Sequence, residues 1–207
     1  MASDRLFVPP RIGNSTMTEI IFRQNRRAFS NIRKRRGGIV KVGRHIAINV
    51  GGACYGNGKP WAQGGLGIYF GPRSRHNFSE ALDEDEPQTS QRAEVNAAII
   101  ALDKVKELLD QEKLDTSLVL IISDSRYLVD GITQNIYKWQ DNGWRNARRR
   151  EVANKEAFEE LDELVDELED DYGVFVKFWW VPKEENEDAD EMARQAAGFY
   201  DSDSDDD

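Results

Sequence analysis

Apolar residues alternate with small or polar ones in the part of the chain that follows residue 38. This period of two is typical of strands buried on one face, and it predicts strands at about 39–54, 63–71 and 76–82. Proline or glycine lies between consecutive strands, so we expect an antiparallel meander.

The rest of the chain alternates predicted helices with predicted strands. An unbroken apolar run at 118–122 indicates a strand covered on both faces, and a second strand is expected at 174–181. Helices are expected at 90–109, from about 125 through 136, at 154–171 and at 188–199. The first carries one apolar stripe, made of Val95, Ile99, Leu102, Val105 and Leu109. Hairpins followed by alternating helices and strands predict an α/β fold with helices packed on a mixed sheet.

The chain has 207 residues, of which 39% are hydrophobic, so it can bury one substantial core. We expect a basic flexible arm at 1–38, one folded domain at 39–199 and an acidic disordered tail at 200–207. Cys54 is the single cysteine, which excludes an internal disulfide. No apolar run approaches the ~20 residues that span a bilayer, and the start lacks a signal peptide's apolar segment. An intracellular monomer with no membrane partner is expected.

Charge is distributed unevenly along the sequence. Residues 1–46 hold 11 basic and two acidic residues, a net charge of +9, so the total of −10 leaves −19 for the remainder. A basic arm on an acidic body can bind nucleic acid, direct the protein to the nucleus, or fold back on the body. The run Arg33-Lys34-Arg35-Arg36 is either an import or phosphate-contacting patch or a solvated linker. A nuclear or cytoplasmic location is favoured over a mitochondrial one.

Three acidic residues lie at junctions of the predicted elements. Glu94 is near the start of the first helix, Asp124 follows the buried strand, and Asp190 is near the start of the last helix. Carboxylates that converge beside a strand end can bind Mg²⁺ and support phosphodiester hydrolysis. Each also has a structural explanation, because acids favour helix N-termini and aspartate caps helices.

The sequence around these acids resembles type 1 ribonuclease H from about residue 44 to 199. The resemblance is carried by Gly52-Ala53-Cys54-Tyr55-Gly56-Asn57-Gly58-Lys59-Pro60, Gly67-Ile68-Tyr69-Phe70-Gly71, Gln88-Thr89-Ser90-Gln91-Arg92-Ala93-Glu94, Ser123-Asp124-Ser125-Arg126-Tyr127, Gly131-Ile132-Thr133, Trp139 to Asn142-Gly143-Trp144-Arg145, Val152-Ala153-Asn154-Lys155 and Asn186-Glu187-Asp188-Ala189-Asp190. It implies a five-stranded mixed sheet in the order 3-2-1-4-5 with flanking helices. It also implies cleavage of the RNA strand of RNA–DNA hybrids by two Mg²⁺ ions on four carboxylates, of which Glu94, Asp124 and Asp190 match the second, third and fourth.

Two departures from the family pattern affect hydrolysis. The family's first aspartate bridges both metal ions, and its position is occupied here by Gly51. The family also carries a histidine in the loop before the fourth acid, whereas residues 181–190 are shorter and contain none; Glu184 or Glu185 is the available substitute ligand. Any bound ion should be Mg²⁺, held weakly by Glu94, Asp124 and Asp190, or the domain should bind none.

The nucleic-acid surface matches the family more closely than the metal site does. By resemblance, Asn57 and Gln91 contact RNA 2′-hydroxyls, and Thr89 and Asn154 contact DNA phosphates. Ser90 replaces the usual asparagine of the hybrid-reading turn. Trp139 and Trp144 match the DNA-facing channel, with core packing as the alternative. Arg145 begins a basic cluster with Arg148, Arg149 and Arg150, which matches a substrate-binding protrusion or is a solvated loop.

Three functions follow from these patterns. The first is a ribonuclease H-like domain that binds RNA–DNA hybrid or a related duplex and lacks hydrolytic activity. The second is an active Mg²⁺-dependent hybrid ribonuclease that uses Glu94, Asp124 and Asp190. The third is a protein-interaction scaffold whose acidic helix at 156–171, or whose acidic tail, meets a basic partner.

Overall fold

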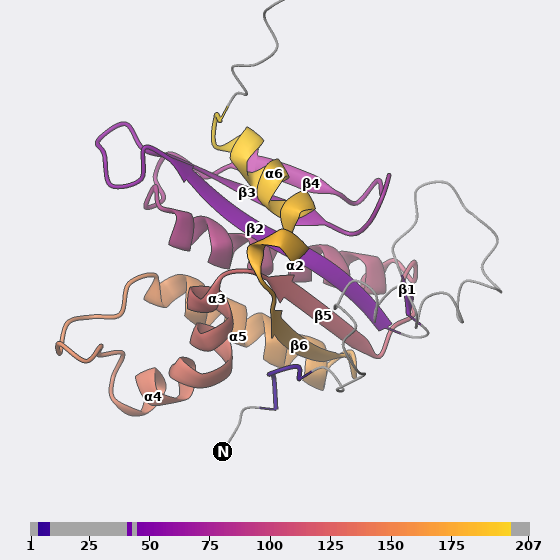
Figure 1. Cartoon of the computed structure of the whole chain (residues 1–207). Helices are drawn as coiled ribbons and strands as arrows, with labels where there is room; N and C mark the ends of the chain where they lie inside the picture. The colour runs from indigo at the N-terminus through magenta and orange to yellow at the C-terminus, as the bar shows by residue number, and fades with distance from the viewer. Residues whose placement is uncertain (1–3, 9–40, 43–44, 200–207) are drawn as a thin grey trace, which may run out of the picture.

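The structure, a computed structural model, describes residues 4–8, 41–42 and 45–199. Most of the predicted arm, including the basic run 33–36, and the predicted acidic tail lie outside these residues. The five main strands form one mixed sheet in the order β4-β3-β2-β5-β6 (Figure 1). They are β2 (His45–Tyr55), β3 (Gln63–Tyr69), β4 (Phe78–Ala81), β5 (Leu118–Ser123) and β6 (Phe175–Trp180). The predicted order 3-2-1-4-5 is confirmed.

The strand predicted at 39–54 is two strands in the structure. A short β1 (Lys41–Val42) pairs antiparallel with the beginning of β2. Two adjoining strands share the period-two pattern of one long strand, so hydropathy did not locate the break.

The long central strand β2 is paired on both sides for only part of its length. Its antiparallel pairing with β3 runs from Asn49 to Tyr55, whereas its parallel pairing with β5 ends where Asn49 meets Ile122. Beyond that point, no strand in the described part of the chain pairs with β2 on its β5 side. The carboxyl end of β5 therefore opens beside the middle of β2, where open α/β sheets place ligands.

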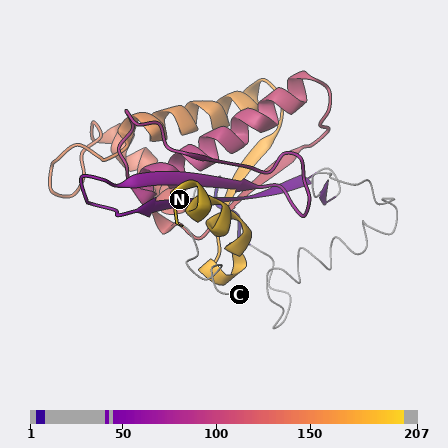
Figure 2. The same ribbon diagram turned by 90° about the horizontal axis from the view of Figure 1, so that it is seen from above.

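The helices cover the two faces of the sheet unequally (Figure 2). The long α2 (Ser90–Asp110) and α5 (Lys155–Asp170) pack together on one face, and α6 (Glu187–Ala196) packs on β2 and β3 from the other. Between β5 and α5 lie α3 (Arg126–Asp130), a π-helical turn (Gly131–Asn135) and α4 (Ile136–Asp141). The last two form the continuation of α3 that the sequence predicted as one helix.

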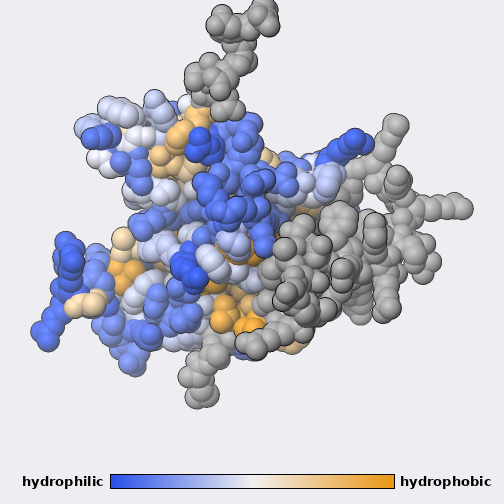
Figure 3. Space-filling view, in the orientation of Figure 1, coloured by the Kyte–Doolittle hydropathy of each residue, from blue (hydrophilic) through white to orange (hydrophobic). Residues whose placement is uncertain are grey.

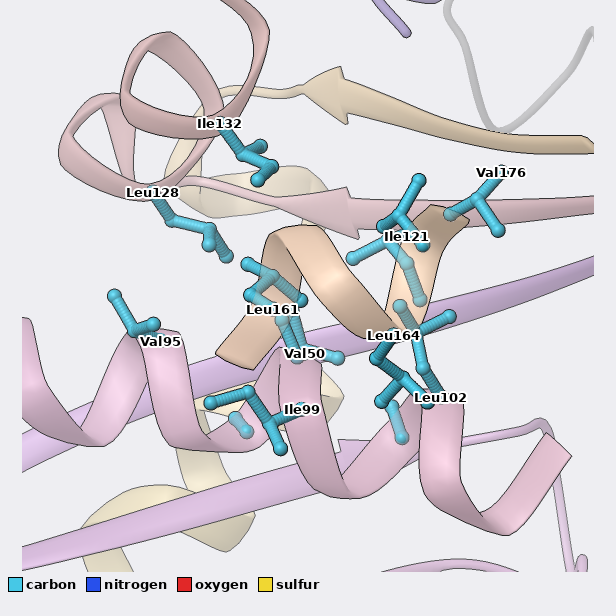
Figure 4. Packing of buried hydrophobic residues seen from close by; sticks show 14 of the residues in the cluster. Val50, Val95, Ile99, Leu102, Ile121, Leu128, Ile132, Leu161, Leu164 and Val176 are labelled. Atoms are coloured by element: carbon cyan, nitrogen blue, oxygen red, sulfur yellow. The ribbon is translucent and has the colours of Figure 1, made fainter. Parts of the chain in front are cut away.

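The main core lies between the sheet and the pair α2 and α5 (Figure 4). Val50 from β2, Ile121 from β5 and Val176 from β6 point from the strands toward Ile99 and Leu102 of α2. These side chains are at most 5% exposed. Four of the five residues in the predicted apolar stripe of α2 are buried, and Leu109 is partly buried against the same core. This packing fixes the start of α2, and hence Glu94, relative to the strand ends.

Residues 4–8 belong to the folded body, although the sequence placed them in the arm. Leu6 pairs in parallel with Phe178 of β6, the N–H of Phe7 donates to the Phe178 carbonyl (2.9 Å), and the Phe178 N–H donates to the Arg5 carbonyl (2.8 Å). The Arg5 side chain is 8% exposed and forms ion pairs with Asp162 and Asp166 of α5. Sequence patterns did not indicate this docking because the partners are far apart along the chain.

Candidate carboxylate site and nucleic-acid interface

The structure brings the three predicted acids together beside the unpaired side of β2. Glu94 stands on the second turn of α2, Asp124 follows the last residue of β5, and Asp190 lies in the first turn of α6. The charges of Asp124 and Asp190 both act on Glu94 and raise its pKa. Asp124 and Asp190 therefore both lie near enough to Glu94 for their charges to act on it.

Glu94 approaches β2 closely because Gly52 has no side chain. A Cβ at Gly52 would lie 2.3 Å from the Glu94 nitrogen, so only glycine permits this contact between strand and helix. Burial of Glu94 and the nearby charge of Asp124 raise its pKa well above the usual range, although hydrogen bonds from the Gly52 amide and the Ser123 hydroxyl (3.3 Å) oppose the shift. The site thus favours the protonated form of Glu94.

Asn186 joins the elements around the site. Its buried side-chain amide donates to Asp124 Oδ1 (2.7 Å) and to the Val50 carbonyl (2.9 Å), and its oxygen accepts from the Asn49 side chain (2.9 Å). Its own carbonyl accepts from the Asp190 N–H (3.1 Å). One residue therefore connects β2, the end of β5 and the start of α6, and it fixes one oxygen of Asp124.

The Gly51 position faces the start of α6. A Cβ built there would lie 3.0 Å from the carbonyl carbon and oxygen of Ala189 and 3.1 Å from the Asp190 nitrogen. These distances are tighter than ordinary van der Waals contact, so a side chain here would require the start of α6 to give by a few tenths of an ångström. Gly51 points toward Asp190, as a fourth acid would.

Asp190 has a basic partner from the connection between β6 and α6. The Lys183 Nζ lies 3.2 Å from Asp190 Oδ2, and Lys183 begins a single 3₁₀ turn, Lys183–Glu185. Glu185, proposed from the sequence as a substitute ligand, has a raised pKa because of burial and the neighbouring Glu184. Among the residues that the structure describes, no group of three or more histidine, cysteine or acidic side chains is arranged to hold a metal ion.

The turn between β2 and β3 carries the first of the predicted nucleic-acid contacts. Asn57 is exposed, and its Nδ2 donates to the hydroxyl of Ser90 (3.4 Å) at the start of α2. Thr89 is the N-cap of α2, and its hydroxyl accepts a hydrogen bond from the Arg92 N–H (3.1 Å). Gln91, in the first turn of α2, is exposed. The structure therefore places these four predicted residues on one continuous edge.

Asn154 lies at the start of α5 in a left-handed backbone conformation (φ 57°). Its side chain donates to the Tyr127 hydroxyl (3.1 Å), which in turn donates to the Ala153 carbonyl (2.8 Å). Tyr127 therefore orients Asn154. No pattern in the sequence predicted this contact.

The two predicted channel tryptophans differ in exposure. Trp144 is only 8% exposed and belongs to the main core, so its ring is not an open stacking surface. Of the two interpretations of Trp144 given from the sequence, core packing is the one that fits. Trp139 is partly buried, with its ring 5.8 Å from that of Trp144 and 5.2 Å from that of Phe158. A left-handed backbone at Trp144 (φ 58°), after Gly143, turns its side chain inward.

The arginine cluster lies on the loop that projects beside α4. Arg145, Arg148, Arg149 and Arg150 are all exposed, and the Asn146 side chain accepts hydrogen bonds from the backbone N–H groups of Arg148 (2.9 Å) and Arg150 (3.1 Å). This projection is strongly hydrophilic in Figure 3. It carries exposed positive charge.

Comparisons with known proteins agree with this geometry. The family model for RNase H matches residues 44–198, about three quarters of the chain. This chain belongs to the ribonuclease H family. That family consists of hydrolases that act on RNA–DNA hybrids and generally use Mg²⁺.

The relatives of this ribonuclease H domain span mammals, bacteria and viruses. It is 32% identical to ribonuclease H1 of Mus musculus over 160 residues, which cover 75% of this chain and 51% of the relative. The chain thus spans about half the length of that mammalian relative, but 91% of the ribonuclease H of Afipia carboxidovorans, at 32% identity over 73% of this chain. The solved PFV RNase H domain shares its fold at 20% identity (TM-score 0.53, covering 73% of this chain and 93% of that one). A further solved structure of this fold, LC11-RNase H1 in complex with RNA/DNA hybrid, is 23% identical (TM-score 0.50, 73% and 96% covered).

The residues of this ribonuclease H domain do not fit the two Mg²⁺ ions of the family's site. The bridging position is Gly51, which supplies no ligand and lies in close contact with the α6 backbone, Asp190 is paired with Lys183, and one oxygen of Asp124 accepts from Asn186. Two divalent ions at close range repel strongly unless shared anionic oxygens lie between them.

Sequence reasoning assigned no role to Asn186, Lys183 or Tyr127. Asn186 could have been found, because asparagine before a helix start is a cap signal next to a candidate acid. Lys183 carried no such signal, since its pairing depends on the short path between β6 and α6.

Proposed function

We propose that this domain binds RNA–DNA hybrid, or a related duplex, and hydrolyses it poorly or not at all. The observation that carries the proposal is Gly51, which supplies no carboxylate at the position that bridges the two metal ions in the family. A Cβ there would lie 3.0–3.1 Å from the backbone of Ala189 and Asp190, so an acid would also need a small shift of the start of α6. An ion at this site lacks the shared oxygen that two-metal catalysis requires.

The predicted binding surface supports retained recognition. Asn57, Ser90 and Gln91 follow one edge, and Asn154 is oriented by Tyr127. Hydrogen bonds to 2′-hydroxyls distinguish RNA from DNA, whereas phosphate contacts from the arginine loop supply affinity without sequence preference.

A second candidate function is hydrolysis with three carboxylates. The convergence of Glu94, Asp124 and Asp190 favours it, since these positions match the family's remaining acids. Against it stands the Lys183 partner of Asp190, which reduces the negative charge available to a metal ion.

A scaffold function for the acidic helix has less support. On α5, Asp162 and Asp166 bind Arg5, and Glu167 binds Lys106 (2.6 Å). These acids are thus engaged within the chain.

None of the helices in the described part of the chain has the length and apolar character needed to cross a membrane.

Binding and cleavage measured in parallel test the proposal. The parent should bind a labelled RNA–DNA hybrid in EDTA, more tightly than it binds duplex DNA of the same sequence. It should show no cleavage above background in Mg²⁺ or Mn²⁺. Cleavage by the parent that Glu94→Gln abolishes would establish the three-carboxylate enzyme, and absence of binding to any duplex would favour the scaffold.

A further inference from the structure

The connection between β6 and α6 places a cation among the acids. The Lys183 side chain is 60% exposed, Asp190 is 19% exposed, and the ammonium nitrogen lies 3.2 Å from Asp190 Oδ2. An exposed pair of this kind adds little to stability. Its effect is on charge, because a positive group stands where the family's site concentrates negative charge.

A second cation lies on the same rim. The Arg126 guanidinium stacks 3.7 Å from the centroid of the Trp180 ring, and the Trp180 indole donates to the Asp124 carbonyl (3.0 Å). Arg126 is exposed and follows Asp124 by two residues. Figure 1 shows the connection from β6 to α6 passing beside the tip of β5, and the Val181 N–H donates to the Ser123 carbonyl there (3.0 Å). Lys183 therefore pairs with Asp190, and Arg126 is held through Trp180 next to the backbone of Asp124.

Lys183 is suited to a second ligand besides Asp190. An ammonium group has three N–H donors, and the Asp190 carboxylate takes one of them. The stem is flexible and mostly exposed, so the ammonium can move toward a phosphate oxygen at the rim without displacing buried groups. Such a phosphate would meet a side-chain cation where the family presents metal ions.

We propose that Lys183 is the resident cation of this site, and that it contacts a backbone phosphate of the bound duplex so that binding needs no divalent ion. This inference rests on the proposed function and adds to it the residue that takes over charge neutralisation. Arg126, fixed on Trp180, supports the same phosphate-binding rim.

The test measures hybrid affinity of the full chain in EDTA and in low millimolar Mg²⁺, at several monovalent salt concentrations. The variants are Lys183→Gln and Lys183→Arg, with Lys106→Gln as the matched control. Lys106 also pairs with an acid, Glu167, but it lies near the end of α2, away from the carboxylate site. Both lysines are partly exposed, so neither glutamine variant should unfold the domain.

The parent should bind equally, within about twofold, in EDTA and in Mg²⁺. Lys183→Gln should weaken binding about three- to tenfold and reduce the slope of log affinity against log salt by about 0.9, the value for one lost phosphate contact. Lys183→Arg should retain the slope, and Lys106→Gln should match the parent. A tenfold or greater gain of parent affinity in Mg²⁺, or equal behaviour of the two glutamine variants, would overturn the inference while leaving hybrid binding intact. Absence of parent binding in both buffers would instead overturn the proposed function itself.

Discussion

Replacing Gly51 with aspartate tests whether the missing acid is the defect in this domain. The new carboxylate would point toward Asp190 and complete a set with Glu94 and Asp124. It would also meet an obstacle, because its Cβ would lie 3.0 Å from the Ala189 carbonyl. The start of α6 must therefore shift by a few tenths of an ångström before the acid is accommodated.

The tight contact at Gly51 and the binding of Mg²⁺ should have opposite effects on the stability of Gly51→Asp. Overpacking of this kind costs about 1–3 kcal/mol, so Gly51→Asp should be less stable than the parent without metal. Binding to the folded state alone restores stability, by about 1.4 kcal/mol when Mg²⁺ is present at ten times its dissociation constant. For a chain of this size that gain corresponds to about 3–6 °C in Tm.

Thermal unfolding in EDTA and in Mg²⁺, with hybrid cleavage measured alongside, separates these effects. Gly51→Ala is the control, since it adds the same Cβ without a ligand and should lose stability with no response to Mg²⁺. Gly51→Asp should respond to Mg²⁺ and cleave the hybrid slowly. Adding Lys183→Gln to it should strengthen the response, because Asp190 then has no competing cation.

Two results would refute this reasoning. Equal Mg²⁺ stabilisation of the parent and of Gly51→Asp would show that the bridging acid is not what limits metal binding. Metal stabilisation of Gly51→Asp with unchanged hybrid affinity and no cleavage would show that the defect lies elsewhere, for example in the histidine-free loop.

Three further predictions concern the arm, the core and the buried acid. Deleting residues 9–37 should weaken hybrid binding and reduce the slope of log affinity against log salt. Deleting residues 1–37 should also lower Tm, because Arg5 and its ion pairs are lost. An unchanged slope for the shorter deletion would exclude the arm from binding. Trp144→Ala should cost about 3–5 kcal/mol of unfolding free energy by emptying a core position, and a parent-like Tm in differential scanning calorimetry would contradict its burial. Because the pKa of Glu94 is raised in the folded state, ionised Glu94 destabilises the fold. Glu94→Gln should therefore be more stable than the parent at pH 7. The difference should vanish below about pH 4, where Glu94 is protonated in both the folded and the unfolded chain. Denaturant titrations at both pH values check this, and a pH-independent difference would contradict it.

The sheet and the acids were predictable because their signals are local. Glycine and proline divide the strands of the meander, the apolar run ending at Ile122 marks a central strand, and Asp124 follows it directly. The strand order was predicted from the resemblance to the ribonuclease H family together with these local signals. Glu94 and Asp190 lie near helix starts that periodicity locates well.

Other features depend on contacts that a one-dimensional pattern does not contain. The same residues, Asn142-Gly143-Trp144, fit an exposed loop and a loop that turns its tryptophan inward, and only the left-handed backbone at Trp144 decides between them. The closeness of α6 to Gly51 follows from packing of the whole helix on β2 and β3. The pairing of Lys183 with Asp190 likewise depends on how tightly the chain turns after β6.

The docking of residues 4–8 on β6 has a consequence for how the chain is made. Arg5 is translated well before its partner Asp162, which follows 157 positions later, and Phe178 follows later still. Residues 4–8 therefore have no β6 edge to pair with until nearly the entire domain has been synthesised, and an unpaired segment of this kind can recruit other chains. Closing so long a loop also costs entropy that only the finished sheet and α5 can offset. Residues 4–8 are thus translated long before the strand and helix that hold them, and they are among the last parts of this domain to reach their native place.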